Sequence, residues 1–527
     1  MSSIAEESTF CKRRLFADGL REAVGKWLPL LLVFAVALLV RKLVVANTDV
    51  AAVITLAERV LDGQRQAIDF IELNPPASIY FYVPGVALAR LLGLSPEVVT
   101  DGLAFIVLGA GIRLSVGILA RTGVLEDFDG RKLAVLIAGI LTILPGQTFG
   151  EREHIVTAMF LPMLAVLAVR AKAMTPGFWS LVAAALGAGA MIVVKPYLIV
   201  GFIPAVVGAA YAARSWRVLV ALENWIVLAT VAVYGAVVVM VFPEFITETV
   251  PLVSAVYLPL RNPWTIMVSE FAAVPIWLAA CFAIVWLQRK KIAGWHYGLL
   301  LVASAGFMVA FIVQGKGWAY HAYPMLALVL IALAFAVSEH KPPASAPDGG
   351  RRLGPISAFG AFFVLTFCWM NTPDTVSMSA LAGPIRQAKP HPTMLEISSD
   401  PAIGQPLVRE VGGRWVGTVS FLWITMGGQW RRTHESLPPE TAARIADYMA
   451  LDRRFLVGDI RRARPDIILV EKAPTDWEAW ARADPEIAEL LKPYSEVVTM
   501  NNVLVLKRES DGPQRTGRET PRPADVR

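Results

Sequence analysis

The chain has 527 residues, of which 55% are hydrophobic and 17% are charged, and its mean hydropathy is +0.54. Soluble domains carry about 25% charged residues, so this composition excludes a string of water-soluble domains and indicates a polytopic membrane protein. The net charge of +6 does not indicate nucleic acid as a partner, because the placement of Lys and Arg in such a chain sets its topology. Three scattered cysteines are too few for a disulfide framework or a metal cluster.

A basic segment, residues 1–26, precedes the first apolar stretch, Trp27 to Ala46. This stretch is long enough to cross a bilayer, which takes about 20 residues, and its basic flank predicts a cytoplasmic amino terminus. Further apolar stretches bring the expected number of spans to about eleven. They lie at 102–120, 133–148, 155–170, 178–194, 197–213, 218–241, 271–287, 295–313, 322–338 and 354–370. Alternating these spans places the basic clusters inside, with Arg41 and Lys42 as the main exception.

The segment Ala77–Leu94 is left out of that count. It is apolar and aromatic, but it contains Pro84, Gly85 and Arg90. If it were a full span, every later loop would change sides and the basic clusters would lie outside, against the positive-inside rule. We therefore expect a helix that lies along the outer interface or dips into it.

The character of the chain changes after the membrane domain, residues 27–371. Residues 381–508 are mixed in polarity and predict a small α/β domain, which the number of spans places outside the cytoplasm. Strands are expected at Trp415–Ile424, Asp466–Val470 and Val497–Leu506, and helices at Pro439–Arg462 and Trp477–Lys492. Residues 509–527 are rich in Pro, Arg and Asp, which is typical of a disordered tail. The expected fold is thus an all-α polytopic membrane bundle followed by an extracytoplasmic α/β domain.

The first outer loop combines acidic residues with an amphipathic helix. Apolar residues in Val50–Asp62 recur at helical spacing, and a short amphipathic helix after a span is expected to lie on the membrane surface. Asp49 then stands at the lipid–water boundary. A simpler interpretation is that Asp49 or Thr48 only caps this helix. The loop continues through Asp69 and Glu72 to Asn74-Pro75-Pro76.

Two later outer turns carry ionisable residues at the ends of spans. Glu151-Arg152-Glu153-His154 places four ionisable residues in a row at the mouth of an apolar bundle, and its simplest interpretation is a solvated turn. Lys195-Pro196-Tyr197 places a lysine at a span end, where it could simply snorkel to the interface.

A third outer turn is Gly315-Lys316-Gly317-Trp318, followed by Tyr320 and His321. An aromatic belt at the interface accounts for its Trp and Tyr residues, but not for two glycines that flank a lysine, nor for His321. Together the outer turns gather carboxylates, cations, a histidine and aromatic residues on one side of the membrane. An ion-coupled carrier would place ionisable groups within its spans, so this distribution favours a reaction at the outer interface.

The order of these features resembles the GT-C superfamily of integral-membrane glycosyltransferases, in its protein-mannosyltransferase and aminoarabinose-transferase-like branch. The resemblance covers about residues 27–340 and rests on the loop placement of five features: Asp49, Asn74-Pro75-Pro76, Glu151-Arg152-Glu153-His154, Lys195-Pro196 and Gly315-Lys316-Gly317-Trp318. Members of the family often have two adjacent acidic residues in the first loop, whereas Val50 follows Asp49 here.

The resemblance implies transfer of a sugar, with inversion, from a polyprenyl-phosphate carrier to a lipid, glycan or protein acceptor at the outer face of the cytoplasmic (inner) membrane. Asp49 matches the general base. The cations expected to bind the donor phosphate are Lys195 first, then Arg152 and Lys316. Residues assigned to substrate binding are Asp69, Glu72, Glu151, Glu153, His154, Tyr197, Trp318, Tyr320 and His321. Asp49 with Glu151 or Glu153 could also bind Mg or Mn, although no ligand spacing demands a metal.

Two other functional classes stay open. One is a polysaccharide polymerase or ligase, which also uses lipid-linked glycans but relies on arginines in large outer loops. The other is a non-enzymatic translocator of lipids or glycans, for which the low charge within the spans is unfavourable.

Overall fold

The computed structural model describes residues 28–44, 47–126, 128–288, 295–339, 353–372 and 378–509. The expected cytoplasmic segment 1–26 and nearly all of the expected tail 509–527 lie outside the described residues. The described residues divide into two compact units. The first lies within Met1–Ile68, Leu73–Ser254 and Leu258–Asp374, and the second within Asp69–Glu72, Ala255–Tyr257 and Thr375–Arg527.

The first unit is helical in its described parts. After the helix Leu28–Leu43, the loop expected to lie outside contains α2 (Thr48–Leu61), α3 (Ala77–Tyr80) and α4 (Val83–Leu92). The longer helices that follow are α5 (Pro96–Ala120), α6 (Gly130–Thr142), α7 (Arg152–Ala171), α8 (Phe178–Val194), α9 (Ile199–Ala212), α10 (Leu222–Val241), α13 (Ala273–Gln288), α14 (Trp295–Gln314), α15 (Ala319–Ser338) and α16 (Leu353–Met370). Two short helices, α11 (Val250–Val256) and α12 (Trp264–Ser269), lie between α10 and α13.

Every stretch that the sequence predicts as a span overlaps one of these helices. By length and composition, five helices among the described residues can cross a membrane: Pro96–Ala120, Arg152–Ala171, Trp216–Val241, Tyr297–Gln314 and Ala319–Ser338. A sixth span is added if the pair Leu28–Leu43 and Thr48–Leu61, which meets at a bend of 80°, counts as one. The other apolar helices have 10–17 residues. The membrane bundle is therefore confirmed, whereas the expected number of about eleven spans is not.

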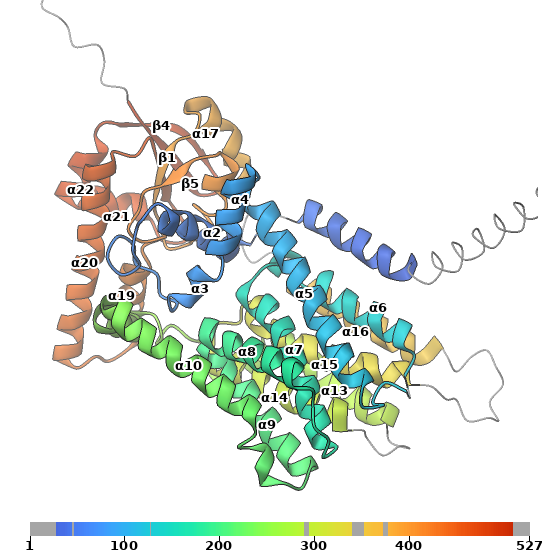
Figure 1. Ribbon diagram of the computed structural model, residues 1–527. Coiled ribbons are helices and arrows are strands. Elements are labelled where there is room, and N and C mark those ends of the chain that lie inside the picture. The colour runs from blue at the N-terminus through green and yellow to red at the C-terminus, as the bar shows by residue number, and fades with distance from the viewer. Residues whose placement is uncertain are drawn as a thin grey trace, which may run out of the picture. The chain divides into compact units, whose positions relative to one another are not determined.

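Two helices form the centre of the bundle. Nearly every side chain of α7 and of α15 is buried. α7 packs against α5, α8, α9, α14 and α15, and α15 packs in turn against α6, α13, α14 and α16; Figure 1 shows both among the other helices. Both begin with polar residues, Arg152-Glu153-His154 in α7 and Tyr320-His321 in α15. The most buried part of the bundle thus presents its polar residues at two helix starts.

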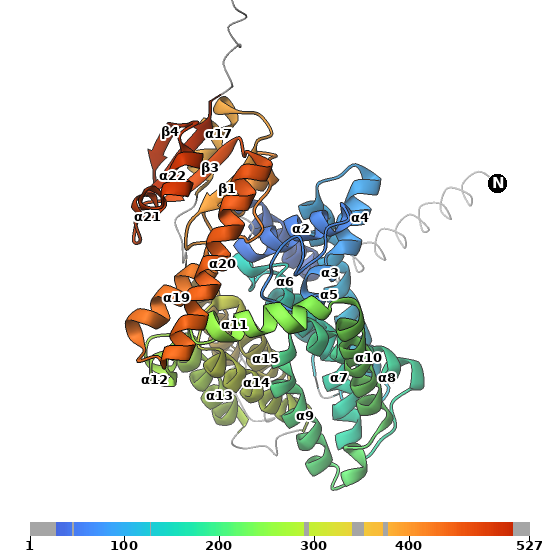
Figure 2. The same ribbon diagram turned by 90° about the vertical axis from the view of Figure 1, so that its left-hand side faces the viewer.

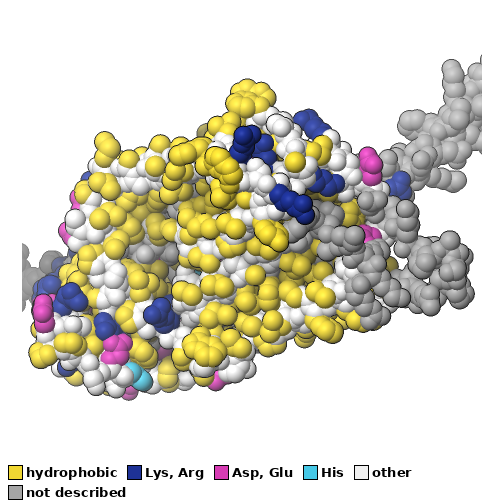
Figure 3. All heavy atoms as spheres, turned by 90° about the horizontal axis from the view of Figure 1, so that it is seen from below, with side chains coloured by type: hydrophobic (Ala, Val, Ile, Leu, Met, Phe, Trp, Pro, Cys, Tyr) yellow, Lys and Arg dark blue, Asp and Glu magenta, His cyan; other side chains and the backbone are white. Residues whose placement is uncertain are grey.

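Helices at the periphery expose apolar side chains instead. On α10, Leu228, Val233 and Met240 are exposed. The face drawn in Figure 3 is largely hydrophobic, with charged side chains in separate small groups. Exposed apolar patches of this extent are unusual on soluble monomers and mark contact with lipid or a partner. The surface of this unit therefore agrees with burial in a bilayer.

One of the two exceptions to the charge sorting, Arg41, has a partner inside the protein. Its Nε and Nη2 each donate to Oδ2 of Asp101 on α5 at 3.0 Å, and its guanidinium lies 5.0 Å from the centre of the Phe149 ring. A paired and stacked arginine does not carry a free charge into a loop. The positive-inside rule counts loop charges, so Arg41 does not weigh against the predicted orientation.

The second unit contains a five-stranded mixed sheet of order β2-β1-β3-β5-β4. The strands are β1 (Thr393–Ile397), β2 (Arg414–Trp415), β3 (Ile467–Glu471), β4 (Tyr494–Met500) and β5 (Val503–Arg508). β1 pairs in parallel with β2 and β3, while β5 pairs antiparallel with β3 and β4. The helices are α17 (Ala382–Ala388), α18 (Leu407–Glu410), α19 (Trp423–His434), α20 (Pro439–Ala463), α21 (Trp477–Ala483) and α22 (Pro485–Leu491).

Alternate residues of the central strands face two different cores. Ile467 and Leu469 pack with residues of α17 and α18, whereas Ile468 and Val470 pack with residues of α20, α21 and α22. The sheet is therefore covered on both faces, and Figure 2 shows α20, α21 and α22 beside it. The predicted α/β character of this region is confirmed.

Some of its predicted elements need correction. The stretch Trp415–Ile424 is a strand only at its first residue, because the chain turns and Trp423 begins α19. The run Val497–Leu506 is a hairpin of β4 and β5 that turns at Asn501 and Asn502, which have positive φ. The helix expected at Trp477–Lys492 is broken at Pro485, whose preceding Asp484 caps α22. Since proline disfavours a helical residue before it, this break follows from the sequence.

Candidate active site

Asp49 lies in the first turn of α2, with its carboxylate free of any capping role. Asn47 is the N-cap, and its side-chain oxygen accepts a hydrogen bond from the Asp49 amide at 2.7 Å. The interpretation of Asp49 as a helix cap is therefore wrong. The Asp49 side chain is 33% exposed, so a solvent-borne substrate can reach it.

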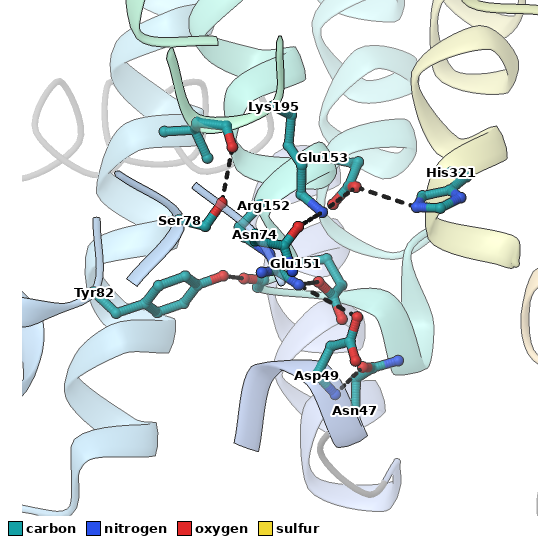
Figure 4. Close-up of polar contacts among 12 residues, drawn as sticks. Asn47, Asp49, Asn74, Ser78, Tyr82, Glu151, Arg152, Glu153, Lys195 and His321 are labelled. Carbon is teal, nitrogen blue, oxygen red and sulfur yellow. Dashed lines mark hydrogen bonds and ion pairs between the residues drawn. The ribbon is translucent and has the colours of Figure 1, made fainter. Parts of the chain in front are cut away.

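Arg152, the first residue of α7, lies against Asp49 and Glu151 through one nitrogen. Its Nη2 is 3.3 Å from Asp49 Oδ2 and 3.9 Å from Glu151 Oε2, and Figure 4 shows both carboxylates directed at the guanidinium. Arg152 and Glu151 are buried. The Nε and Nη1 atoms of Arg152 have no hydrogen-bond partner among the described residues. Buried guanidinium donors left without partners are costly and are well suited to an incoming anion.

Glu153 connects three elements through a single oxygen atom. Its Oε1 is 2.9 Å from the Lys195 ammonium at the end of α8, accepts a hydrogen bond of 2.6 Å from the Tyr197 hydroxyl, and lies 3.7 Å from Nε2 of His321 on α15. All of these groups except Tyr197 are buried. The structure thus brings together Glu153, Lys195, Tyr197 and His321, which the sequence placed in three separate turns.

The loop between the helix Leu28–Leu43 and α5 reaches the same cluster through residues to which no role was assigned. Asn74 Oδ1 accepts a hydrogen bond from Lys195 Nζ at 3.3 Å. Nearby, Ser78 Oγ donates to the Val194 carbonyl at 2.8 Å and the Tyr82 hydroxyl to the Gly150 carbonyl at 2.6 Å. The Asn-Pro-Pro motif, which places an amide before a rigid turn, was the signal that could have pointed to Asn74.

His154 serves the local structure of this turn. Its Nδ1 accepts a hydrogen bond from the Gly150 amide at 3.1 Å, and its Nε2 contacts the Leu141 carbonyl at 2.7 Å. Its ring also lies 4.8 Å from the ring of Phe149. Because both ring nitrogens already have backbone partners, the geometry favours a supporting role for His154 over contact with a substrate.

The glycines around Lys316 have a structural reason. Gly315 and Gly317 both have positive φ, and a Cβ at Gly317 would lie 2.1 Å from the Phe271 ring. Lys316 donates a hydrogen bond to the Leu260 carbonyl and lies 6.0 Å from the centre of the Trp318 ring. Burial, and then the nearby Arg261, lower the pKa of Lys316 to about 8.

The aromatic residues predicted to bind substrate surround His321. Its ring centre lies 4.6 Å from that of Tyr320, 5.2 Å from that of Trp318 and 5.6 Å from that of Tyr197. Trp318 is exposed, whereas Tyr320 is buried. These rings could stack on an apolar sugar face.

Asp69 and Glu72, also predicted to bind substrate, belong to the second unit. There the intervening Ile71 amide donates to the Thr418 carbonyl at 2.8 Å. The described contacts of the cluster come from the first unit.

The cluster combines three carboxylates, Asp49, Glu151 and Glu153, with two cations, Arg152 and Lys195. Burial first, and then the neighbouring Asp49 carboxylate, raise the pKa of Glu151 well above its usual range. Asp49 and Arg152 lie in the first turns of α2 and α7, where the helix dipole favours negative charge. The arrangement can hold an anion beside a partly exposed carboxylate.

The residues do not fit a divalent cation. No group of three His, Cys, Asp or Glu side chains is arranged to hold a metal ion in the part of the chain that the structure describes. The Arg152 guanidinium already lies against both Asp49 and Glu151. A fixed positive charge at that place opposes a second cation.

Comparison with known proteins identifies the fold. No known protein-family model and no curated protein sequence matches the chain. Among solved structures it is similar to ArnT from Cupriavidus metallidurans bound to undecaprenyl phosphate, with a TM-score of 0.55 and 14% identity over 92% of this chain and 99% of that one. The apo state of ArnT gives a TM-score of 0.53 at 14% identity, over 92% and 98%.

A third solved structure, arabinofuranosyltransferase AftD from Mycobacteria, matches with a TM-score of 0.39 and 14% identity, over 91% of this chain and 40% of that one. The two ArnT structures match almost end to end, so the similarity includes both the helical bundle and the C-terminal unit. The chain therefore has the fold of ArnT, in agreement with the fold that the loop pattern predicts.

Proposed function

We propose that the chain is a membrane glycosyltransferase that takes a sugar from a polyprenyl-phosphate carrier and transfers it to a lipid, glycan or protein acceptor at the outer face of the cytoplasmic membrane. The observation that carries the proposal is the partly exposed Asp49 carboxylate, 3.3 Å from the buried Arg152 guanidinium. The likeness to ArnT, whose structure holds undecaprenyl phosphate, supports the choice of donor class. A shared fold alone does not establish a shared function. The proposed activity therefore rests on the geometry of the site.

Asp49 is the general base in this proposal. The acceptor hydroxyl or amine must lose a proton as its oxygen or nitrogen bonds to C1 of the sugar. Asp49 is the one carboxylate of the cluster with substantial exposure, at 33%, whereas Glu151 and Glu153 are at 0%. Only Asp49 can therefore meet an acceptor without rearrangement. The contact with Arg152 at 3.3 Å orients its carboxylate.

Arg152 and Lys195 bind the phosphate that leaves. The bond from C1 to the phosphate oxygen breaks with its electron pair on the phosphate, so negative charge grows there and cations stabilise it. The unpartnered Nε and Nη1 of Arg152 supply donors without breaking an existing contact. Lys195 must instead share its ammonium with Glu153 and Asn74. The structure therefore favours Arg152 as the first phosphate contact, ahead of the Lys195 that the sequence ranked first.

The remaining polar groups suit the sugar. Tyr197 and His321 lie around Glu153, and His321 Nδ1 has no hydrogen-bond partner among the described residues. Trp318 and Tyr320 add aromatic surface beside them. Lys316, whose ammonium already bonds to the Leu260 carbonyl, is a secondary phosphate contact at most.

A transfer assay with the purified full-length protein in detergent tests the proposal. A panel of polyprenyl-phosphate sugars is offered with an envelope extract as acceptor, and release of polyprenyl phosphate is followed. Release that depends on acceptor supports the proposal. Movement of lipid across reconstituted vesicles without any release would instead identify a translocator, and chain growth that survives loss of Asp49 would identify a polymerase or ligase.

A further inference from the structure

The charged cluster contains one carboxylate more than its cations can match. Lys195 pairs with Glu153 at 2.9 Å. Arg152 reaches both remaining carboxylates through the same Nη2, Asp49 at 3.3 Å and Glu151 at 3.9 Å, and only the Asp49 contact is a hydrogen bond. Glu151 is therefore the carboxyl group without a cation of its own.

The surroundings of Glu151 do not support a negative charge. Its side chain is 0% exposed, and neither Oε1 nor Oε2 has a hydrogen-bond partner among the described residues. A buried carboxylate with no hydrogen bonds is strongly disfavoured, because nothing replaces its lost hydration. Asp49 differs in both respects, since it is partly exposed and directly bonded to Arg152.

We propose that Glu151 is protonated in the resting protein and acts as a neutral carboxyl group that positions Asp49 and Arg152. The five titratable groups then carry two negative and two positive charges, which sum to zero. Arg152 stays committed to Asp49, and its remaining N–H groups stay available to an anion. This inference rests on the proposed function for the part that concerns catalysis, but the protonation of Glu151 stands on geometry alone.

Groups on four elements around Glu151 determine whether its carboxyl group is protonated. Asp49 on α2 and Glu153 on α7 favour the protonated form, while Arg152 on α7 and Lys195 at the end of α8 oppose it. Tyr82, at the start of α4, is near enough for Glu151 to act on it and is itself neutral at ordinary pH. Burial has the largest effect, and it raises the pKa of Glu151 well above its usual range.

The neutral state matters for a phosphate ligand. A lipid phosphate brings at least one negative charge, and a third carboxylate charge beside Arg152 would repel it. A protonated Glu151 removes that repulsion and can donate its O–H to Asp49. Glu151 is then a positioning residue, because it acts through its neighbours and not on the reacting atoms.

Infrared spectroscopy tests the protonation without any need for turnover. The purified full-length protein is compared with E151Q and, as a matched control at an ion-paired neighbour, with E153Q. We expect the difference spectrum between the unmodified protein and E151Q to contain a carbonyl stretch of a protonated carboxyl group, shifted in D₂O, and the difference spectrum between the unmodified protein and E153Q to lack it. A difference spectrum for E151Q without this band at neutral pH would overturn the proposal.

Turnover separates this inference from the proposed function. Gln resembles a protonated Glu, so E151Q should reduce transfer by about tenfold at most, whereas E151A and D49N should reduce it by about 10²-fold or more. A loss in E151Q as large as the loss of about 10²-fold or more expected for E151A would show that a negative charge at Glu151 is needed, which contradicts the proposal. Full activity of D49N would remove the proposed base, yet the infrared result would still decide the state of Glu151.

Discussion

The guanidinium of Arg152 and the carboxylate of Asp49, 103 positions apart in the chain, meet at 3.3 Å. Arg152 begins α7, a central helix of the bundle, and Asp49 lies in the first turn of α2. Their exposures differ sharply, at 2% and 33%. The bundle thus holds the cation rigidly, and the cation holds a carboxylate that solvent can reach. That asymmetry is what a base next to a phosphate site requires.

The Asp49→Asn variant should keep its fold and lose its activity. Asparagine preserves the size of the side chain and an oxygen that can accept from Arg152, but it removes the basicity. We expect turnover to fall by about 10²-fold or more, with unchanged insertion in the membrane. A transfer assay with purified protein measures this.

Asp62→Asn is the matched control for this variant. Asp62 is the C-cap of the same helix and forms an exposed ion pair with Arg90 at 2.8 Å, which contributes little to stability. Its loss should leave transfer close to the unmodified rate. Equal activities of the two variants would mean that Asp49 is not the base.

Lys195→Met should weaken both donor binding and the maximal rate, if the ammonium contact strengthens as charge grows on the leaving phosphate. It also leaves Glu153 buried without its cation, which typically destabilises by about 3–5 kcal/mol. The double variant Lys195→Met/Glu153→Gln removes that unpaired charge, so it should recover stability and not activity. Rates at varied donor concentration, together with thermal unfolding in detergent, separate the two effects.

Lys172→Met is the control for Lys195. Lys172 is the exposed C-cap residue of α7, and its loss should change neither measurement. Lys195→Arg should restore part of the rate, limited by the different shape of the guanidinium. Unchanged donor dependence in Lys195→Met would leave Arg152 as the phosphate contact and Lys195 as a structural residue.

Periodicity and loop charges predicted much of this architecture. The helix Thr48–Leu61 follows from its apolar spacing, and the polar turns at Arg152, Lys195 and His321 were visible because charge interrupts apolar stretches. The sequence could not show that Glu153 contacts both Lys195 and His321, because that contact depends on how α7, α8 and α15 pack.

Some predictions made from residue types alone differ from the structure. The stretch Trp415–Ile424 is rich in β-formers, yet α19 begins at Trp423, because tertiary packing overrides strand propensity. Asp49 was a plausible helix cap, but Asn47 two residues earlier takes that role. His154 was predicted to bind substrate because it follows three charged residues. The structure shows that both of its ring nitrogens have backbone partners, the Gly150 amide and the Leu141 carbonyl.

The orientation of the chain can be measured in intact cells. Charge sorting places the second unit outside the cytoplasm. A cysteine introduced at Glu440, an exposed residue in the first turn of α20, should therefore react with a membrane-impermeant thiol reagent before lysis. Reaction only after lysis would reverse the predicted sides and move every proposed site residue to the cytoplasmic face.

Asp452 should make the second unit less stable as the pH rises. It is buried on α20, where its Oδ2 accepts from the amide and hydroxyl of Thr425 at 2.9 and 2.7 Å, and burial raises its pKa to about 7 from 3.8. A raised folded pKa means that the folded state binds the proton more tightly. The contribution of Asp452 to the free energy of unfolding is therefore complete below about pH 4, and it is lost as the pH rises through about 7.

Hydrogen exchange of α19 in the full-length protein measures this effect. After correction for intrinsic rates, protection of α19 should fall between pH 5 and 7, by about tenfold per unit at most. Asp452→Asn should flatten that dependence, while Asp447→Asn, an exposed position on the same helix, should keep it. A flat profile in the unmodified protein would show that Asp452 does not titrate in this range.

The most direct measurement is an experimental structure of the full-length protein with undecaprenyl phosphate bound. The account predicts the phosphate beside Asp49, with its oxygens about 2.7–2.9 Å from Arg152 nitrogens and with the Lys195 ammonium turned from Glu153 toward it. The lipid chain should lie between helices of the first unit. A phosphate bound away from both Arg152 and Lys195, or an Arg152 that keeps all its present contacts while the lipid binds elsewhere, would contradict the account.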